Sequence, residues 1–227
     1  GRGKDNNNLN IKKGQIPMKS KLISLVIMAL VVLSLMVPGS VAAADTASQS
    51  EVVLAQQSAQ SWLDNIASIN TELSQWQGAV VVPTQIYQSV DGGTIAYMYA
   101  ITNNKKVVGH ILVGSSRYNN DIFEAGTSAP PLIPSNNEVQ AAAKSTELGI
   151  ELAKDAIPVK FIYTGVDGYY AVYETRGQDV AFNQVFKNAV LVSELRSAIP
   201  SPSVYQENKK SSQDFKSQLS ILDSDSD

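Results

Sequence analysis

Two stretches of the chain place apolar residues at every third or fourth position, which is the period of an amphipathic helix. The first stretch covers residues 49–77, and Ser48 and Glu51 at its start have the spacing of a helix capping box. Gly78 suits the position just after the end of a helix. We therefore expect one amphipathic helix here, with a break near Asn70 as the alternative.

The second stretch begins after Ser135, which is followed by Glu138 at the same capping-box spacing. Its apolar stripe continues as far as Ala153. Gly149 weakens the pattern, and Pro158 bars any continuation of the helix. The pattern predicts a second amphipathic helix whose apolar stripe extends to Ala153.

Between the two helices the apolar period changes to two, which is the period of a half-buried strand. Residues 94–101 and 107–113 alternate in this way on either side of Asn103-Asn104, and asparagine tolerates the positive φ that tight turns need. We therefore expect a β-hairpin. Residues 80–82 and 85–89 are expected to add another strand before it.

After the second helix the same alternation returns. Residues 159–163 and 169–175 flank the turn-forming residues Val166-Asp167-Gly168. A further short strand is expected before the second helix, at 122–124. Residues 179–195 fit either a further strand pair or a helix. The order of helix and then strands thus occurs twice. We predict an α+β fold in which an antiparallel sheet of hairpins packs against two amphipathic helices, and a helix-plus-hairpin duplication is one explanation of that order.

Residues 18–44 have the order of parts of a secretory signal peptide. Lys19 and Lys21 form a short positive region, residues 22–37 are a run of 16 residues without charge, and Pro38-Gly39 follows as a helix breaker. Small residues with the spacing that a signal peptidase needs come next. The pattern predicts export from the cytoplasm.

An uncleaved membrane anchor is the minor alternative, but 16 apolar residues are fewer than the roughly 20 that span a bilayer. We expect cleavage between Ala42 and Asp45, so that the protein is secreted or extracytoplasmic and meets the membrane only transiently through its signal peptide. Residues 1–17 are polar and aperiodic, and we interpret them as a mis-annotated or untranslated leader. A single α+β domain is expected over 45–200, followed by a polar acidic tail or linker over 201–227.

Charge and composition exclude several classes of function. Of the 18 basic and 21 acidic residues, six basic residues and one acid precede Asp45, so residues 45–227 carry 12 basic and 20 acidic side chains, a net charge of −8. Such a chain is repelled by phosphate backbones, so we exclude nucleic acid as a partner. The sequence has no cysteine, which excludes thiolate catalysis, thiolate metal sites and disulfide bonds.

His110 is the single histidine of the sequence and lies in the middle of an apolar strand. A Ser–His–Asp mechanism would need it, but no serine has the local sequence of a nucleophile elbow. One histidine without cysteines does not supply the ligands of a zinc site. We expect its side chain on the exposed face of the sheet, and we predict no catalytic residue, metal site or cofactor.

Two series of carboxylates are candidate functional groups. Glu147, Glu151 and Asp155 would share one face of the second helix, a spacing more typical of a solvated face than of a catalytic pair. A second acidic series is spaced like the first ligands of a calcium loop, and it is either a plain acidic tail or part of a calcium-binding repeat. It consists of Asp223, Asp225 and Asp227.

Two segments, "VDGGTIAYMYAITNNKKVVGHILVGSSRYNNDIFEAGTSAP" and "GYYAVYE", resemble the inhibitory pro-domains of secreted cysteine peptidases of the streptopain type, which are papain-like enzymes. The resemblance covers roughly residues 50–175. It implies an exported, non-catalytic domain that acts by protein–protein contact, with a secreted or in-cis cysteine peptidase as its partner. No catalytic residue carries over, because no peptidase domain with cysteine and histidine is present in the chain.

A pro-domain of this kind blocks a cleft with a loop or an added strand, using backbone hydrogen bonds and a few apolar side chains. The alternative interpretation is that the apolar residues of the 122–133 region simply cover one end of the core. Two other functions are open: an extracytoplasmic regulatory or binding domain of the PepSY type, and a carboxylate-dependent hydrolase. The candidate partner-binding residues are Ile122, Phe123, Pro130, Pro131, Leu132 and Ile133.

Overall fold

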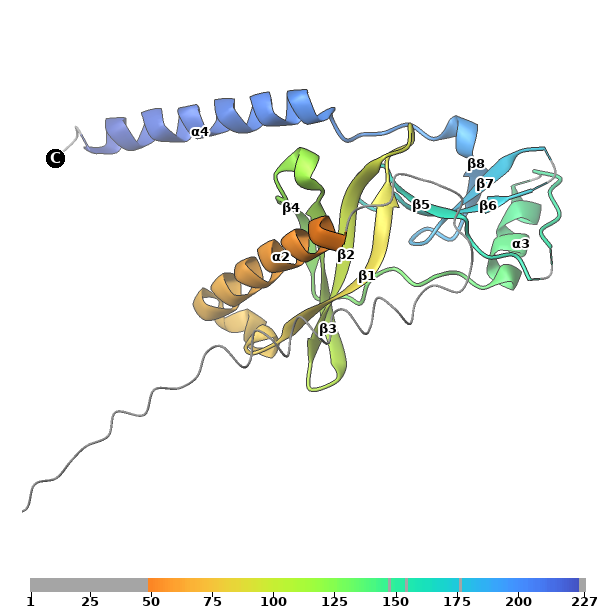
Figure 1. Cartoon of the computed structure of the whole chain (residues 1–227), viewed down its shortest axis with the longest axis horizontal. Helices are drawn as coiled ribbons and strands as arrows, with labels where there is room; N and C mark the ends of the chain where they lie inside the picture. The colour runs from red at the N-terminus through yellow and green to blue at the C-terminus, as the bar shows by residue number, and fades with distance from the viewer. Residues whose placement is uncertain (1–48, 147, 154, 176, 225–227) are drawn as a thin grey trace, which may run out of the picture. The chain divides into compact units, whose positions relative to one another are not determined.

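The computed structural model describes residues 49–224, except residues 147, 154 and 176 (Figure 1). The described part of the chain has an α+β fold, as the sequence predicted, with eight strands in one mostly antiparallel sheet. In chain order the elements are α2 (Gln49–Ile69), η1 (Thr71–Trp76), β1 (Val80–Gln88), β2 (Thr94–Asn103), β3 (Lys106–Gly114), η2 (Ser116–Tyr118), β4 (Ile122–Gly126), α3 (Asn136–Ser145), β5 (Lys160–Tyr163), β6 (Tyr169–Glu174), β7 (Asp179–Asn183), β8 (Ala189–Leu191), η3 (Val192–Glu194) and α4 (Pro202–Ser224), where η marks a 3₁₀-helix.

The strand order in the sheet is β4-β3-β2-β1-β5-β6-β7-β8. It consists of two antiparallel meanders, β1–β4 and β5–β8, which meet through a single parallel pair, Gln88 opposite Ile162. A helix precedes each meander, α2 before the first and α3 before the second. The order of helix and strands expected from the sequence is therefore present in both halves.

One face of α2 packs against β1, β2 and β3 (Figure 1). The Tyr99 hydroxyl donates a hydrogen bond to the carbonyl of Val52 over 2.8 Å, which attaches the first turns of the helix to β2. The α-helix ends at Ile69, and Asn70 caps η1, so the expected break near Asn70 is confirmed. The buried residues of α2 recur at helical spacing and are Val52, Ala55, Ala59, Leu63 and Ala67.

Two glutamines of α2 satisfy backbone groups at the start of β1. Gln56 donates to the Val81 carbonyl over 3.0 Å, and the Gln60 side chain accepts from the Val81 amide at 3.0 Å. Gln60 also donates to the Ala79 carbonyl over 3.1 Å. These side chains stand where the backbone of a neighbouring strand would otherwise pair, so α2 covers this part of the β1 edge.

The capping box at α3 is confirmed, because the Ser135 hydroxyl accepts from the Glu138 amide while the Glu138 carboxylate accepts from the Ser135 amide. The prediction that the helix carries its apolar stripe to Ala153 is wrong, since α3 ends at Ser145. Gly149 follows with a φ of +61°, a conformation that a helix interior does not contain. Ala153 lies in an irregular segment.

Both predicted hairpins are present, as β2–β3 and β5–β6. The first turn lies one residue later than expected, with positive φ at Asn104 and Lys105. Residues 179–195, which fitted a strand pair or a helix, form β7 and β8 followed by η3. The short strand predicted at 122–124 is β4, which extends to Gly126.

Both meanders contribute side chains to one aromatic cluster. Its closest ring contact joins Tyr163 and Tyr169, whose centroids lie 5.0 Å apart. Tilted and edge-on ring pairs of this kind add to the stabilisation that burial alone provides. The members of the aromatic cluster are Tyr87, Tyr118, Phe123, Phe161, Tyr163, Tyr169 and Tyr205.

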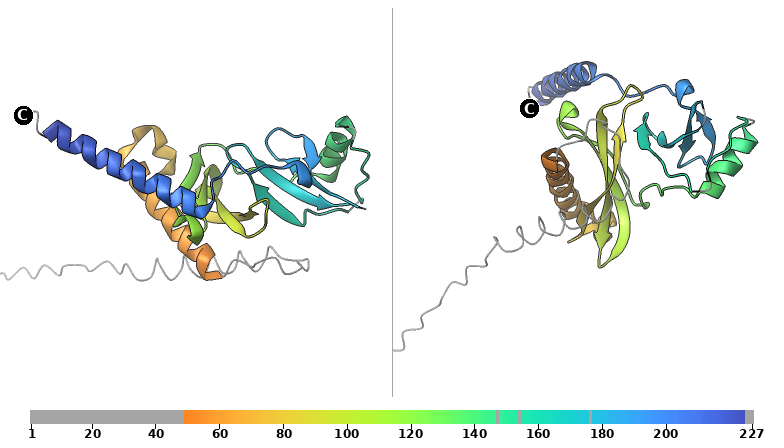
Figure 2. Two further views of the ribbon diagram at one scale, coloured as in Figure 1. Left: turned by 90° about the horizontal axis from the view of Figure 1, so that it is seen from above. Right: turned by 45° about the vertical axis from the view of Figure 1, so that its right-hand side comes forward.

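The polar composition after residue 200 predicted a tail or linker, but Pro202–Ser224 form the helix α4. Its beginning lies beside η2 (Figure 2). Tyr205 packs its ring 5.3 Å from that of Tyr118, so α4 closes one end of the aromatic cluster.

Several predictions from the sequence fall outside the described residues: the leader, the signal peptide and most of the terminal acidic series. Within residues 49–224, as far as they are described, we find no helix with the length and apolarity needed to cross a membrane.

Candidate functional site

His110 is buried in the sheet with 6% of its surface exposed, so the expectation of an exposed side chain is wrong. It lies on β3, between β2 and β4, on the face that turns toward the aromatic cluster. Its cross-strand neighbour on β4 is Gly126. A Cβ atom at Gly126 would lie 2.8 Å from His110 Cε1, so glycine leaves the space that the imidazole ring occupies.

Both ring nitrogens of His110 face hydrogen-bond acceptors. Nε2 lies 3.2 Å from Glu124 Oε1, and Nδ1 lies 2.8 Å from the carbonyl oxygen of Ser128. The other carboxylate oxygen of Glu124 accepts from the Tyr169 hydroxyl over 2.6 Å. An imidazole ring can donate from both nitrogens only when it is protonated, so this geometry fits the imidazolium ion.

The pKa shifts agree with this assignment. Burial lowers the pKa of His110, but the hydrogen bonds to Glu124 and to the Ser128 carbonyl outweigh it, and the net shift is upward. The hydrogen bond from His110 lowers the pKa of Glu124, against the opposing effect of burial. Burial and then the contact with Glu124 raise the pKa of Tyr169. The hydrogen bonds and the directions of these pKa shifts favour an ion pair of His110 and Glu124 bordered by a neutral phenol.

Ser128 also places its hydroxyl 3.4 Å from His110 Nδ1, which brings a serine, a histidine and a glutamate together. A general base would need a lone pair on Nδ1, but that nitrogen donates to the closer Ser128 carbonyl. The arrangement is therefore suited to holding the backbone at Ser128 rather than to activating the hydroxyl.

The segment 127–134, which connects β4 to α3, has three backbone carbonyls bound by buried side chains of the sheet. His110 of β3 donates to the carbonyl of Ser128. Gln184, at the end of β7, donates to the Leu132 carbonyl over 3.0 Å. On β6, Tyr173 donates to the carbonyl of Pro134 over 3.3 Å. The segment carries prolines 130, 131 and 134, each of which restricts φ, so its backbone is held at several points along its length.

The six predicted partner-binding residues are not equivalent in the structure. Phe123 belongs to the aromatic cluster, and Ile122 is a half-buried residue of β4. Leu132 and Ile133 are exposed, at 75% and 60% of their surfaces. The remaining two, Pro130 and Pro131, are half-buried beside them.

Two further apolar side chains, which sequence reasoning missed, come from the β7–β8 turn. Val185 and Phe186 follow Gln184 directly, and Phe186 is 67% exposed. The hydrogen bond from Gln184 to Leu132 places this turn beside the 127–134 segment. We call the four exposed residues the apolar surface: Leu132, Ile133, Val185 and Phe186.

The turn that carries Val185 and Phe186 is itself fixed. The Asn183 side-chain oxygen accepts from the amides of Val185 and Phe186, each over 2.8 Å. Its amide nitrogen donates to the Asp167 carbonyl over 3.1 Å. Local sequence did suggest a strand pair at this point, but the position of the turn beside Leu132 depends on the sheet order.

The helical face proposed for Glu147, Glu151 and Asp155 does not form, because Glu151 and Asp155 follow the end of α3 and Glu147 lies outside the described residues. Another carboxylate pair, Glu174 and Asp179, lies opposite in the β6–β7 register.

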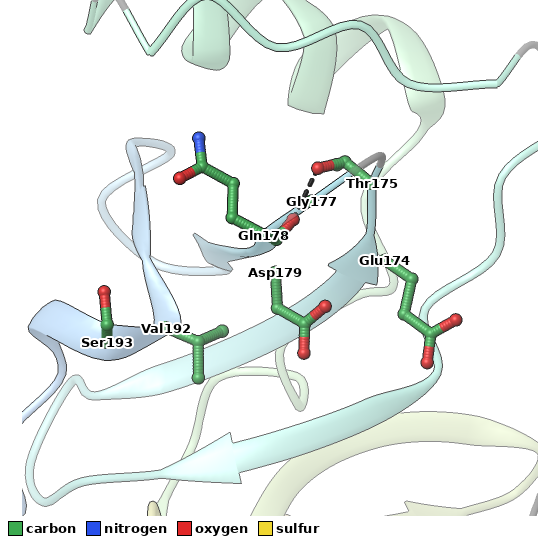
Figure 3. A pocket seen from close by; sticks show the side chains of 7 residues that line it. All are labelled: Glu174, Thr175, Gly177, Gln178, Asp179, Val192 and Ser193. Atoms are coloured by element: carbon green, nitrogen blue, oxygen red, sulfur yellow. Dashed lines mark hydrogen bonds between the residues drawn. The ribbon is translucent and has the colours of Figure 1, made fainter.

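Glu174 and Asp179 line an open depression together with Thr175, Gly177, Gln178, Val192 and Ser193 (Figure 3). The Thr175 hydroxyl donates to the Gln178 carbonyl in the adjoining turn. Among the described residues no group of three or more histidine, aspartate or glutamate side chains is arranged to hold a metal ion.

Comparison of the chain with protein-family models, with curated proteins and with solved structures found no match.

Proposed function

We propose that this chain is an exported, non-catalytic domain that binds a partner protein through its apolar surface. The observation that carries the proposal is the combination of exposed Leu132 and Ile133 with a backbone whose carbonyls are bound by His110, Gln184 and Tyr173. A loop that is already held in one conformation loses less entropy when it binds. Exposed apolar side chains on such a loop are typical of protein-binding segments.

The partner that we propose is a secreted or in-cis cysteine peptidase of the papain type. The resemblance to peptidase pro-domains supports this choice, and it covers β4, which precedes the 127–134 segment, and β6, whose Tyr173 binds the Pro134 carbonyl. In such a complex Leu132 and Ile133 would enter the substrate cleft, while the neighbouring Phe186 would contact its rim. The signal-peptide pattern of residues 18–44 supports the extracytoplasmic location.

Inhibition of several papain-like peptidases by the purified protein tests the proposal. We expect inhibition by the wild-type protein, and the double variant Leu132→Gln/Ile133→Gln to inhibit about tenfold less or weaker still, since burying one aliphatic side chain contributes about 1.5–3 kcal/mol. Ile69→Gln is the matched control, because Ile69 is similarly exposed, at 71%, but lies at the end of α2. Absence of inhibition at micromolar concentrations of the wild-type protein would contradict the proposal.

A second candidate function is an extracytoplasmic regulatory or binding module of the PepSY type. The observation that favours it is the repeated order of a helix and an antiparallel meander in the two halves of the sheet. This candidate predicts that residues 49–126 and 136–191 superimpose. It also predicts that partner binding is unaffected by the substitutions at Leu132 and Ile133.

A further inference from the structure

We propose that His110 is a pH-dependent tether of the 127–134 segment: the protonated ring holds the Ser128 carbonyl, and loss of the proton releases it. The release itself is independent of the proposed function. Its consequence for partner binding rests on that function, because the same segment carries Leu132 and Ile133.

The hydrogen-bond geometry explains why the proton matters. With protons on both nitrogens, His110 donates to Glu124 at one end and to the Ser128 carbonyl at the other. The neutral ring keeps one proton, so a nitrogen lone pair must then face either the Glu124 carboxylate or the Ser128 carbonyl oxygen. Two acceptors facing each other in a buried site repel, so one of the two contacts must open.

The contact that opens is the one to Ser128. Glu124 belongs to β4, and its second carboxylate oxygen is bound by the Tyr169 hydroxyl of β6 over 2.6 Å, so this carboxylate is held in place. Ser128 lies on the surface in an irregular segment. A neutral ring that keeps its proton on Nε2 retains the bond to Glu124 and turns the Nδ1 lone pair toward the Ser128 carbonyl.

The hydroxyl of Ser128 is the second group of that residue within reach of Nδ1. It lies 3.4 Å from Nδ1 and can donate to the lone pair of a neutral ring. The neutral ring therefore has another partner for Nδ1 that can replace the Ser128 carbonyl.

The surroundings of His110 decide the pH range. Among the described residues, Glu124 of β4 is the charged group that acts on His110. On the other side of β3, the β2 neighbour of His110 is the uncharged Ala100. Beyond Glu124 lie three tyrosines, from β1, β5 and β6, whose pKa values burial raises, so they stay neutral. They are Tyr87, Tyr163 and Tyr169. The tether is therefore closed in acid and opens as pH rises above the ordinary range of imidazole.

Nuclear magnetic resonance on the purified protein tests the tether without any partner. The His110 ring signals report its protonation, the Ser128 carbonyl carbon shift reports the hydrogen bond, and ¹⁵N order parameters at Thr127 and Ala129 report backbone mobility. We expect the carbonyl shift to titrate together with the ring. The order parameters should fall from values near 0.85, typical of rigid backbone, toward about 0.6.

Two variants sharpen the test. Ser128→Ala removes the hydroxyl but keeps the carbonyl, so the coupled titration should persist. In His110→Gln the uncharged side chain does not titrate, so the Ser128 signals should become independent of pH across the same range. If the wild-type Ser128 carbonyl shift and the order parameters stay constant while the His110 ring titrates, the tether is overturned, whatever happens to His110→Gln.

The consequence for partner binding has a separate readout. If a peptidase partner is found, wild-type inhibition should weaken as pH rises through the His110 titration, and that of His110→Gln should not. A protein that inhibits nothing but shows the coupled titration contradicts the proposed function and supports the tether. Inhibition that is constant across the titration, together with a mobile segment at high pH, overturns the link between the two.

Discussion

Lys209 and Asp121 are 88 residues apart in sequence, yet the lysine ammonium group lies 2.7 and 2.6 Å from the two carboxylate oxygens of Asp121. The Tyr205 hydroxyl donates to the same carboxylate over 3.2 Å. Asn119 donates to the side chain of Gln206 over 2.8 Å. These bonds attach the first turns of α4 to the loop between η2 and β4.

The first prediction concerns this attachment. Replacing Lys209 with methionine should loosen the first turns of α4 and speed amide exchange at residues 205–209. Both partners are partly exposed, so the free energy of unfolding should fall by less than about 1 kcal/mol. Hydrogen exchange and urea denaturation measure the two effects. Lys210→Met changes an exposed neighbour and should leave both unchanged. Equal effects in the two variants would contradict the assignment.

A second prediction concerns Gln184, which is buried and links two elements. It accepts from the Tyr87 hydroxyl at 3.2 Å and donates to the Leu132 carbonyl. Gln184→Leu leaves both groups without this partner, and an unsatisfied buried group such as the Tyr87 hydroxyl costs about 1–3 kcal/mol. We expect urea denaturation to show a loss of about 2 kcal/mol or more.

The double variant Tyr87→Phe/Gln184→Leu provides the control for this prediction. It removes the hydroxyl that the single variant leaves unsatisfied, so the two changes together should destabilise by less than the sum of the single changes. Strict additivity would show that the hydrogen bond between Tyr87 and Gln184 contributes nothing.

The third prediction tests why α3 is shorter than its apolar stripe. Gly149 has a φ of +61°, and a Cβ atom at this position would meet nothing within 4 Å. Gly149→Ala should therefore cost about 1–2 kcal/mol through backbone strain alone. Thermal unfolding followed by circular dichroism measures it. A gain in stability with an increase in helical signal would show instead that the helix can extend through residue 149.

Local patterns were sufficient for most secondary structure. The capping box of Ser135 and Glu138 and the hairpin turns at Asn104 and Asp167 depend on residues that are close in sequence, and each was predicted to within a residue. The end of α3 was predicted wrongly, because the apolar residues between Ser145 and Ala153 pack against the core as an irregular segment and not as a continued helix. Ile150 packs under α3 as part of this segment.

The candidate site could not be predicted in the same way. His110 lies on an apolar strand, and whether it faces water or the core depends on which elements cover that face. The register of β3 and β4 places Glu124 near His110. Tyr169 belongs to the second meander, and the β1–β5 pairing places it within hydrogen-bond distance of Glu124. The apolar loop predicts Leu132 and Ile133 as contacts, but the carbonyl bonds that hold their segment come from Gln184 and Tyr173, which are distant in sequence.

The last prediction is the pH dependence of global stability. The pKa of His110 is raised from 6.5 in the folded state, so its stabilising contribution is complete below that unfolded value and is lost as pH rises through the folded one. The pKa of Glu124 is lowered from 4.5, so its contribution is complete above that unfolded value and is lost as pH falls through the folded one. The ion pair therefore stabilises the fold most between pH 4.5 and pH 6.5.

Urea denaturation of wild type and His110→Gln at a series of pH values checks this. The difference in unfolding free energy should be largest near pH 5.5, on the order of 2 kcal/mol for a charge-assisted hydrogen bond, and should shrink on both the acid and the alkaline side. When both proteins also carry Glu124→Gln, this difference should no longer shrink at acid pH, because the glutamine side chain does not titrate. A constant difference from acid to alkaline pH would mean that His110 stabilises the sheet by packing, and that its charge contributes nothing to folding.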